Sequence, residues 1–486
     1  MDGKIAASIV TAAIVLWVTA QYVVAVDYPL FAEDYTEIAV MRTFRSVWEV
    51  FTTNHPPPRP LQHLEFYAAT HWTSTAPWAM RLPAFVLHMV AIVGVGALAR
   101  ALGFEPRSAL AAAGLYALYP ATVALVYPAS MGMVGRTPFA IWALAALVAS
   151  ARHPGFAPLA VLSAGIALLF HQSAVVLVPI FFLFGALHCL GSCRRLVPCV
   201  AKQALHPAVL GFACVAAVFL LLTRDSDSPH TSLRSLTSMA SNAVKAMFGV
   251  FPEEIRHFVV EAMRGRNGTA GFTIAAALCS LVAIGVVAAL VRGTHLVRFC
   301  VLGIAFDLAL PIATAGYSQR YTLLAGALAA ILAVDLVKTR RRWVPIVVLL
   351  GAAWCHDTVR ATFAAHQAGR TVARLLDVAA DQCARLPTGK RLVVCDLPLT
   401  WGRERDLMVF HWGFSEALAE RGVRGAFAID QIRTRAFPGE ARARLVDAAT
   451  VAGLREDQGV VLLEYDSLRR DFAVSRTAGV KDNQPR

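Results

Sequence analysis

The chain has 486 residues, of which 57% are hydrophobic and 16% are charged. Roughly a quarter of the residues of a water-soluble domain are charged, so this composition excludes an ordinary soluble enzyme. Apolar runs long enough to cross about 30 Å of hydrocarbon recur as far as residue 356. The sequence therefore predicts a polytopic membrane protein.

The formal net charge is +13, but the basic residues do not form one patch. They stand as short clusters between apolar segments, for example at 194–195 and 340–342. Under the positive-inside rule such clusters mark cytoplasmic loops. The charge therefore reports membrane topology, and we expect no nucleic-acid partner.

The first predicted element is a membrane-spanning signal anchor at residues 5–26, which shows no clear small-residue cleavage site. Further spans are predicted at 82–101, 108–127, 137–151, 156–170, 173–190, 205–223, 271–291, 299–316, 321–337 and 343–356. This gives about eleven spans, with the N-terminus in the cytoplasm and the C-terminus outside. Alanine- and arginine-rich usage favours a bacterial inner (plasma) membrane.

Two extracytoplasmic loops are long, at 27–81 and 224–270. The first contains "EIAVMRTFRSVWEVF", whose apolar residues recur every three or four positions and predict an amphipathic helix on the membrane surface. The prolines of "NHPPPRP" end it, and "LQHLEFYAATHW" predicts a second helix. The later loop becomes amphipathic around "NAVKAMFGVF".

Beyond residue 356 the composition becomes that of a soluble protein. "KRLVVCDLP" and "QGVVLLEYD" predict strands, and "FHWGFSEALAERG" predicts a helix closed by glycine. The predicted fold class is an all-α polytopic membrane protein, residues 1–356, with a small α/β extracytoplasmic domain at 357–486. A disulfide between Cys383 and Cys395 in that domain is left open.

Polar residues among apolar neighbours gather on the predicted outer face, although scattered structural polar groups would divide between both faces. They are Glu33, Asp34, Arg59, His63, Arg81, His88, Arg136, His171, Gln172, Asp307, Gln319 and Arg320. A carboxylate can act as general base on a hydroxyl, and arginines hold phosphate with a bidentate fork. The set therefore suits transfer of a group from a lipid phosphate.

Five stretches in order resemble the GT-C superfamily of polytopic glycosyltransferases that use polyprenyl-phosphate sugars, most closely its O-mannosyltransferase branch with tetratricopeptide repeats. The stretches are "EDYTEI", "RPLQHLEFYAATHW", "RLPAFVLHMVAIVGVGALAR", "GLYALYPATVALVYPASMGMVGRTPFAIWALAALVA" and "YSQRYTLLAG". They cover most of residues 1–340. The repeats of that branch are replaced here by the small α/β domain.

The resemblance implies an inverting, single-displacement enzyme that moves a mannose-like sugar from a polyprenyl-phosphate donor to a hydroxyl of a protein, lipid or glycan. It implies Asp34 or Glu33 as catalytic base, with Asp34 preferred. Residues that would bind the donor phosphate are Arg136, Arg320, Arg59 and His171. Further site candidates are His63, His88, Gln172, Tyr321 and Asp307.

Several residues have a structural alternative. Glu33 and Asp34 could cap a helix N-terminus, and Asp307 could simply pair with an arginine. His55 and His63 could join Glu33 around a divalent metal such as Mg²⁺ or Mn²⁺.

Two rival functions stay open. A secondary transporter would place polar residues near the middle of the bilayer and show inverted repeats. A non-catalytic relative would bind a lipid-linked sugar without transferring it. This role stays open because the pairs Glu33-Asp34 and His171-Gln172 depart from the residues usual in the family.

Overall fold

The computed structural model describes residues 3–26, 28–53, 59–120, 131–190, 206–222, 243–245, 247–248, 250–313, 322–386, 388–398, 400–401, 407–408, 410, 413–423, 425–434, 443–467 and 469–475. Helices make up most of this part of the chain, and all its strands lie in the C-terminal region. The predicted fold class, a helical membrane protein with a small α/β domain at its C-terminal end, is confirmed.

Each predicted span overlaps, within the described residues, a helix of the helical bundle. Its helices are α1 (Gly3–Ala25), α5 (Pro77–Ala101), α6 (Pro106–Ala117), α8 (Met131–Ser150), α9 (Ala157–Phe170), α10 (Leu177–Leu190), α12 (Pro207–Leu222), α15 (Gly268–Arg292), α16 (His295–Ala313), α17 (Leu323–Thr339) and α18 (Val344–Ala384). Short 3₁₀ turns precede α9, α10 and α18: η2 (Pro154–Phe156), η3 (Gln172–Val176) and η5 (Arg341–Trp343).

Within the described residues, five helical segments are long and apolar enough to cross a membrane. They are Ala7–Val24, Pro77–Ala101, Gly132–Ser150, Gly268–Arg292 and Arg341–Ala384. Helices α9, α10 and α12 are apolar but shorter. A chain with this many apolar helices is an integral membrane protein.

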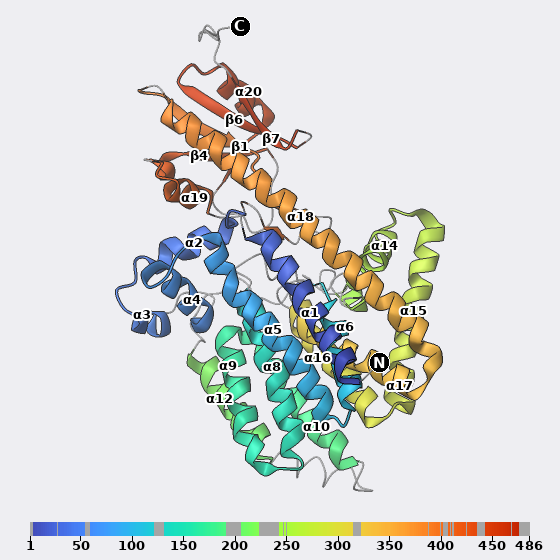
Figure 1. The fold of residues 1–486 in the computed structure, drawn as a ribbon. Coiled ribbons are helices and arrows are strands. Elements are labelled where there is room, and N and C mark those ends of the chain that lie inside the picture. The colour runs from blue at the N-terminus through green and yellow to red at the C-terminus, as the bar shows by residue number, and fades with distance from the viewer. Residues whose placement is uncertain are drawn as a thin grey trace.

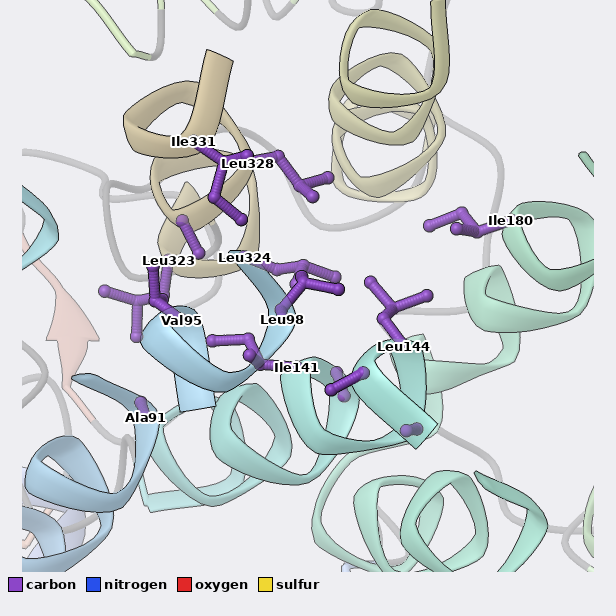
Figure 2. Close-up of a cluster of buried hydrophobic side chains, with 14 of the residues drawn as sticks. Ala91, Val95, Leu98, Ile141, Leu144, Ile180, Leu323, Leu324, Leu328 and Ile331 are labelled. Atoms are coloured by element: carbon purple, nitrogen blue, oxygen red, sulfur yellow. The ribbon is translucent and has the colours of Figure 1, made fainter. Parts of the chain in front are cut away.

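The bundle has one large hydrophobic core in which α5, α8, α10 and α17 meet (Figure 2). Val95 and Leu98 of α5 lie beside Ile141 of α8 and Leu324 of α17 in the close-up. Small residues let helices approach closely in membranes. At Gly326 an added Cβ would lie 2.8 Å from the Tyr119 ring, so glycine is required there.

The first loop folds into three short helices: α2 (Ala32–Met41), α3 (Val47–Thr52) and α4 (Pro60–His71). The prediction of one continuous amphipathic helix is therefore wrong. Ser46 begins a new helix because Glu49 accepts hydrogen bonds from the Arg45 backbone N–H, at 3.1 Å, and from the Ser46 hydroxyl. This is an S-x-x-E helix start.

The C-terminal domain is built on a five-stranded sheet in the order β5-β4-β1-β6-β7, parallel except for β7. The strands are β1 (Arg391–Cys395), β4 (Asp430–Arg433), β5 (Arg444–Leu445), β6 (Val460–Asp466) and β7 (Asp471–Ser475), with a separate pair β2 (Thr400–Trp401) and β3 (Leu407–Met408). Its helices are α19 (Phe414–Glu420), η6 (Ala426–Ala428) and α20 (Ala448–Glu456).

A second core joins this domain to the first loop. On β1, Leu392 and Val394 belong to this second core, whereas Val393 and Cys395 contact a smaller cluster with α20. That alternation is the two-residue period of a strand buried on both faces. Cys395 and Cys383 are free thiols.

The second core also covers the apolar side of α2. Ile38 and Met41 are buried there together with Phe414 of α19, so protein covers the α2 part of the apolar side that the sequence placed on the membrane surface, whereas Trp48 and Phe51 of α3 are exposed. Helix α18 is continuous through residue 356, where the composition changes, and in Figure 1 it runs diagonally from the bundle to the sheet. Helix α14 (Glu253–Met263) packs against α15 beside the bundle.

Candidate active site

Asp34 lies fully buried in the first turn of α2. Its Oδ2 accepts a hydrogen bond from the Phe31 backbone N–H at 2.9 Å, which is the capping arrangement expected of a structural carboxylate. An ionised carboxylate has about four lone-pair sites, so this bond does not use up its capacity to accept a proton.

Arg81 of α5 fixes the turn that presents Asp34. Its Nη1 donates to the Tyr28 carbonyl at 2.7 Å and its Nη2 donates to the Pro29 carbonyl at 2.9 Å. The guanidinium also lies 5.8 Å from the centroid of the Phe31 ring. Because Arg81 is fully buried, its charge and its hydrogen bonds hold α2 against the bundle.

Glu65 of α4 is a second carboxylate beside Asp34. Both of its carboxyl oxygens are buried, with no hydrogen-bond partner among the described residues. Burial, and then the negative charge of Asp34, raise the pKa of Glu65 well above its ordinary value. Burial also raises the pKa of the neighbouring Tyr35 to about 12. The pair therefore combines Asp34, which accepts a hydrogen bond from the Phe31 backbone, with Glu65, whose raised pKa keeps its carboxyl group protonated to a higher pH than usual.

His63 lies on the same helix as Glu65, and its Nε2 is 3.8 Å from Oε2 of Glu37. Metal binding needs several such ligands around one point. Within the described residues, no group of three or more His, Cys, Asp and Glu side chains is placed to hold a metal ion. His55 and the side chain of Glu33 lie outside the described residues. Of the three candidate metal ligands, only His63 is therefore described.

A basic and polar cluster lies at the N-terminal end of α4. Nη1 of Arg59, the residue before α4, is 3.5 Å from Oε1 of Gln62, and that oxygen accepts from the Gly132 backbone N–H at 3.1 Å. A Cβ on Gly132 would lie 2.6 Å from the same oxygen, so glycine allows α8 to begin this close to α4. The first amides of a helix favour anions.

His171 and Ser173 continue this cluster at the end of α9. The imidazole Nδ1 of His171 lies 2.8 Å from the Ser173 hydroxyl and accepts from the Ser173 backbone N–H at 3.1 Å. Nη1 of Arg136 donates to that hydroxyl at 2.9 Å. Arg59 and Gln62 form one hydrogen-bonded group, and His171, Ser173 and Arg136 form another. Gln62 and His171 both lie next to Gly132, and the five residues are here called the basic cluster.

Arg136 also pairs with Asp307 of α16 in a fully buried ion pair. The other carboxylate oxygen of Asp307 accepts from the Ala325 backbone N–H at 3.2 Å. Asp307 therefore pairs with an arginine, which is the structural alternative given for it above. The Nε–H group of Arg136 is left without a partner among the described residues.

Helix α4 connects the carboxylates to the basic cluster. It contacts α2 and α5 as well as α8 and α9. Its residues Arg59 and Gln62 belong to the basic cluster, while Glu65 lies beside Asp34. One helix of twelve residues thus carries a carboxyl group beside Asp34 and contributes to the basic cluster.

Other predicted residues lie elsewhere. The His88 ring packs in the bundle core with its centroid 5.8 Å from that of Tyr116, and its Nε2 has no partner in the described region. Gln172 begins η3 next to His171, and its Oε1 is buried without a described partner. Gln319, Arg320 and Tyr321 fall outside the described residues.

The sequence analysis missed four polar residues of this region: Glu37, Gln62, Glu65 and Ser173. Arg59, Gln62 and Glu65 recur at intervals of three in a segment predicted to be helical, which places them along one side. Ser173 gave no comparable signal, because a hydroxyl in an apolar segment usually bonds to its own helix backbone.

The solved structures with a similar overall arrangement include two of ArnT from Cupriavidus metallidurans. The one bound to undecaprenyl phosphate has 13% sequence identity and a TM-score of 0.48, and the apo structure has 15% identity and a TM-score of 0.42. Each covers 94% of this chain and 94% of ArnT. No protein-family model matches the sequence, and the comparison with curated proteins gave no match.

Proposed function

We propose that this chain is an integral membrane glycosyltransferase of the GT-C type, which transfers a sugar from a polyprenyl-phosphate donor to an acceptor hydroxyl. The observation that carries the proposal is that α4 bears Glu65 beside Asp34 and, one turn nearer its N-terminus, contributes Arg59 and Gln62 to the basic cluster. Such a pairing provides for both ends of a group transfer from phosphate: a base for the incoming hydroxyl and cations for the leaving group.

Asp34 is the favoured base, with Glu33 as its rival. In the transfer the acceptor oxygen forms a bond to the anomeric carbon while its proton passes to the Asp34 carboxylate. The bond from that carbon to the phosphate oxygen breaks, and its electron pair leaves with the polyprenyl phosphate. This single displacement inverts the anomeric centre.

The basic cluster would bind the departing phosphate. Arg59 and His171 stand closest to the N-terminus of α8, whose first amides add a favourable field. Arg136 is held by Asp307 and Ser173, so its role is to position the hydroxyl and imidazole as well as to supply charge. Arg320 and Tyr321, by resemblance, would complete the site.

A mannose-type donor is the first to test, because the sequence motifs resemble the O-mannosyltransferase branch. The proposed orientation places the C-terminal domain, residues 357–486, at the extracytoplasmic face of a bacterial inner membrane. The acceptor hydroxyl would approach from that side, and the donor would enter from the bilayer.

The test uses the purified full chain in lipid nanodiscs with a panel of synthetic polyprenyl-phosphate sugars, and measures release of free polyprenyl phosphate. Wild type is compared with Asp34→Asn, Glu33→Gln and the matched control Glu420→Gln, which removes a carboxylate that pairs with Arg42. We expect about a hundredfold or greater loss in one of the first two variants and near wild-type turnover in the control.

Donor binding is measured separately, with Arg59→Gln against Arg107→Gln, whose side chain is exposed in the first turn of α6. We expect weaker donor binding only in Arg59→Gln, by about tenfold or more. Binding without turnover, unchanged in both acidic variants, would support the non-catalytic role. Absence of donor binding by the wild type would refute the proposal and favour a transporter.

A further inference from the structure

A groove lies between the C-terminal half of α1 and the middle of α18, just beyond residue 356. It has a volume of about 300 Å³ and is lined by Trp17, Ala20, Gln21, Val24, Thr358, Val359, Thr362, Phe363 and His366. The two helices contact each other and lie side by side in Figure 1. Both walls therefore come from segments apolar enough to cross a membrane.

The wall of this α1–α18 groove presents mostly apolar groups, because its two threonine hydroxyls are bonded to backbone carbonyls. The Thr358 hydroxyl donates to the Leu118 carbonyl at 3.0 Å, and the Thr362 hydroxyl donates to the Thr358 carbonyl at 2.8 Å. Both hydroxyls are thus satisfied within the protein. An apolar cavity stays dry and accepts apolar ligands, and hydrocarbon surrounds these helices in a bilayer.

The end of the groove nearest the C-terminal domain is polar and basic. The Tyr28 hydroxyl, just beyond α1, hydrogen-bonds Nδ1 of His366. Val359, Phe363, His366 and Arg370 follow at helical spacing along one side of α18, and Arg370 is exposed. A lipid chain in the groove would bring its headgroup to this basic end.

We propose that the α1–α18 groove binds one acyl chain of an anionic bilayer phospholipid, with the headgroup phosphate beside His366 and Arg370. The occupant is a bilayer lipid and not the polyprenyl donor, because none of the nine lining residues comes from the helices that form the basic cluster. Cationic side chains at a membrane interface attract anionic lipids, and this groove joins such a group directly to an apolar slot.

Occupancy of the groove bears on the first loop. Tyr28 bonds His366 through its hydroxyl and accepts from Arg81 through its carbonyl. The same turn leads to Phe31 and Asp34. A headgroup beside His366 would therefore be linked, through Tyr28 and the turn that follows it, to the candidate base Asp34. This link between lipid binding and the base rests on the proposed function.

The binding site itself is tested without any activity measurement. The full chain is released from nanodiscs containing phosphatidylglycerol and phosphatidylcholine in equal amounts, and retained lipids are counted by native mass spectrometry. Ala20→Trp fills the groove, and Leu16→Trp adds the same indole to the exposed side of α1, where Leu16 is 71% exposed.

We expect wild type and Leu16→Trp to retain one phosphatidylglycerol, and Ala20→Trp to retain about tenfold less. Arg370→Gln, which leaves the groove intact, should reduce the preference for phosphatidylglycerol over phosphatidylcholine. Equal retention by Ala20→Trp and Leu16→Trp would overturn the proposal. So would displacement of the retained lipid by added polyprenyl phosphate in wild type, since the groove would then hold the donor chain.

Discussion

The two halves of the candidate site are supported by different cores. Three members of the basic cluster, Arg136 of α8 and His171 and Ser173 after α9, are carried by the bundle, whose helices form the large bundle core. Asp34 is carried by α2, whose apolar side belongs to the second core, shared with α19 and the sheet. Among the described residues, α4, α5 and α18 link the two regions: α5 and α18 contribute side chains to both cores, and α4 contacts α2 as well as α8 and α9.

This difference separates two tasks. In the proposed function, phosphate binding would depend on charges fixed inside a membrane bundle, where an unsatisfied polar group is expensive. Presentation of Asp34 would depend on a short helix against which the C-terminal domain packs. Variants in one region should therefore leave the other largely intact. The following experiments test whether the two regions respond independently.

The largest effect is expected in the bundle, from Asp307→Leu. It leaves Arg136 buried without its carboxylate, and breaking a buried pair costs about 3–5 kcal/mol. The free energy of unfolding in bicelles measures the loss. The double variant Arg136→Met with Asp307→Leu should recover much of it. A cost below about 1 kcal/mol for the single variant would mean that the pair does not stabilise the bundle.

Arg81→Met should loosen the region of the base while the basic cluster stays in place. It removes two hydrogen bonds from a charged donor, each worth about 1.5–3 kcal/mol. Hydrogen exchange should speed up in residues 28–41 and stay unchanged in α8. Arg107→Met, an exposed arginine of α6, is the control. Equal acceleration in both helices would show that the two regions are not separate.

Glu65→Gln should change the pH dependence of stability. The pKa of Glu65 is raised in the folded protein above the ordinary value of 4.5. Its contribution is therefore complete below pH 4.5 and is lost as the pH rises toward the raised value. Glutamine cannot ionise, so the melting temperature of the variant should gain on that of wild type as the pH rises.

The matched control is Glu456→Gln, which changes an exposed carboxylate at the end of α20. Its melting temperature should follow that of wild type at every pH. If Glu65→Gln does the same, the Glu65 carboxyl is not buried in the folded protein. The negative charge of Asp34 is one cause of the raised pKa of Glu65. In Asp34→Asn, the pH range over which ionisation of Glu65 lowers the stability should therefore be narrower than in wild type.

The smallest effect is expected for Glu420→Ala. Glu420 of α19 pairs with Arg42 at the end of α2, and 47% of the arginine side chain is exposed. Exposed pairs contribute at most about 1 kcal/mol and weaken with salt. The melting temperature should fall slightly in low salt and not at all in high salt. A large loss would mean that this pair, rather than the second core, holds α2.

The sequence predicted the spans and the sheet well, because apolar runs and strand alternation are local signals. It missed the division of the first loop at Ser46, where a helix start outweighs the apolar periodicity. It placed Ile38 and Met41 on a membrane surface because periodicity shows an apolar side but not what covers it.

The candidate site was predicted in part. Arg59, Arg136 and His171 lie in one cluster, as expected of residues that converge. The sequence could not show that Asp307 pairs with Arg136 or that Glu65 adjoins Asp34, since these contacts join residues that are 171 and about 30 positions apart.

The second core also has a consequence for the order of folding. It joins Tyr28 to His366 and Arg42 to Glu420, residues separated by 338 and 378 positions. Chains fold from the N-terminal side during synthesis, so α2 emerges long before the residues that will cover it. The bundle can assemble as its helices insert, but the segment bearing Asp34 must wait for the last quarter of the chain. The segment that bears Asp34 is therefore among the last parts of the protein to reach its final place.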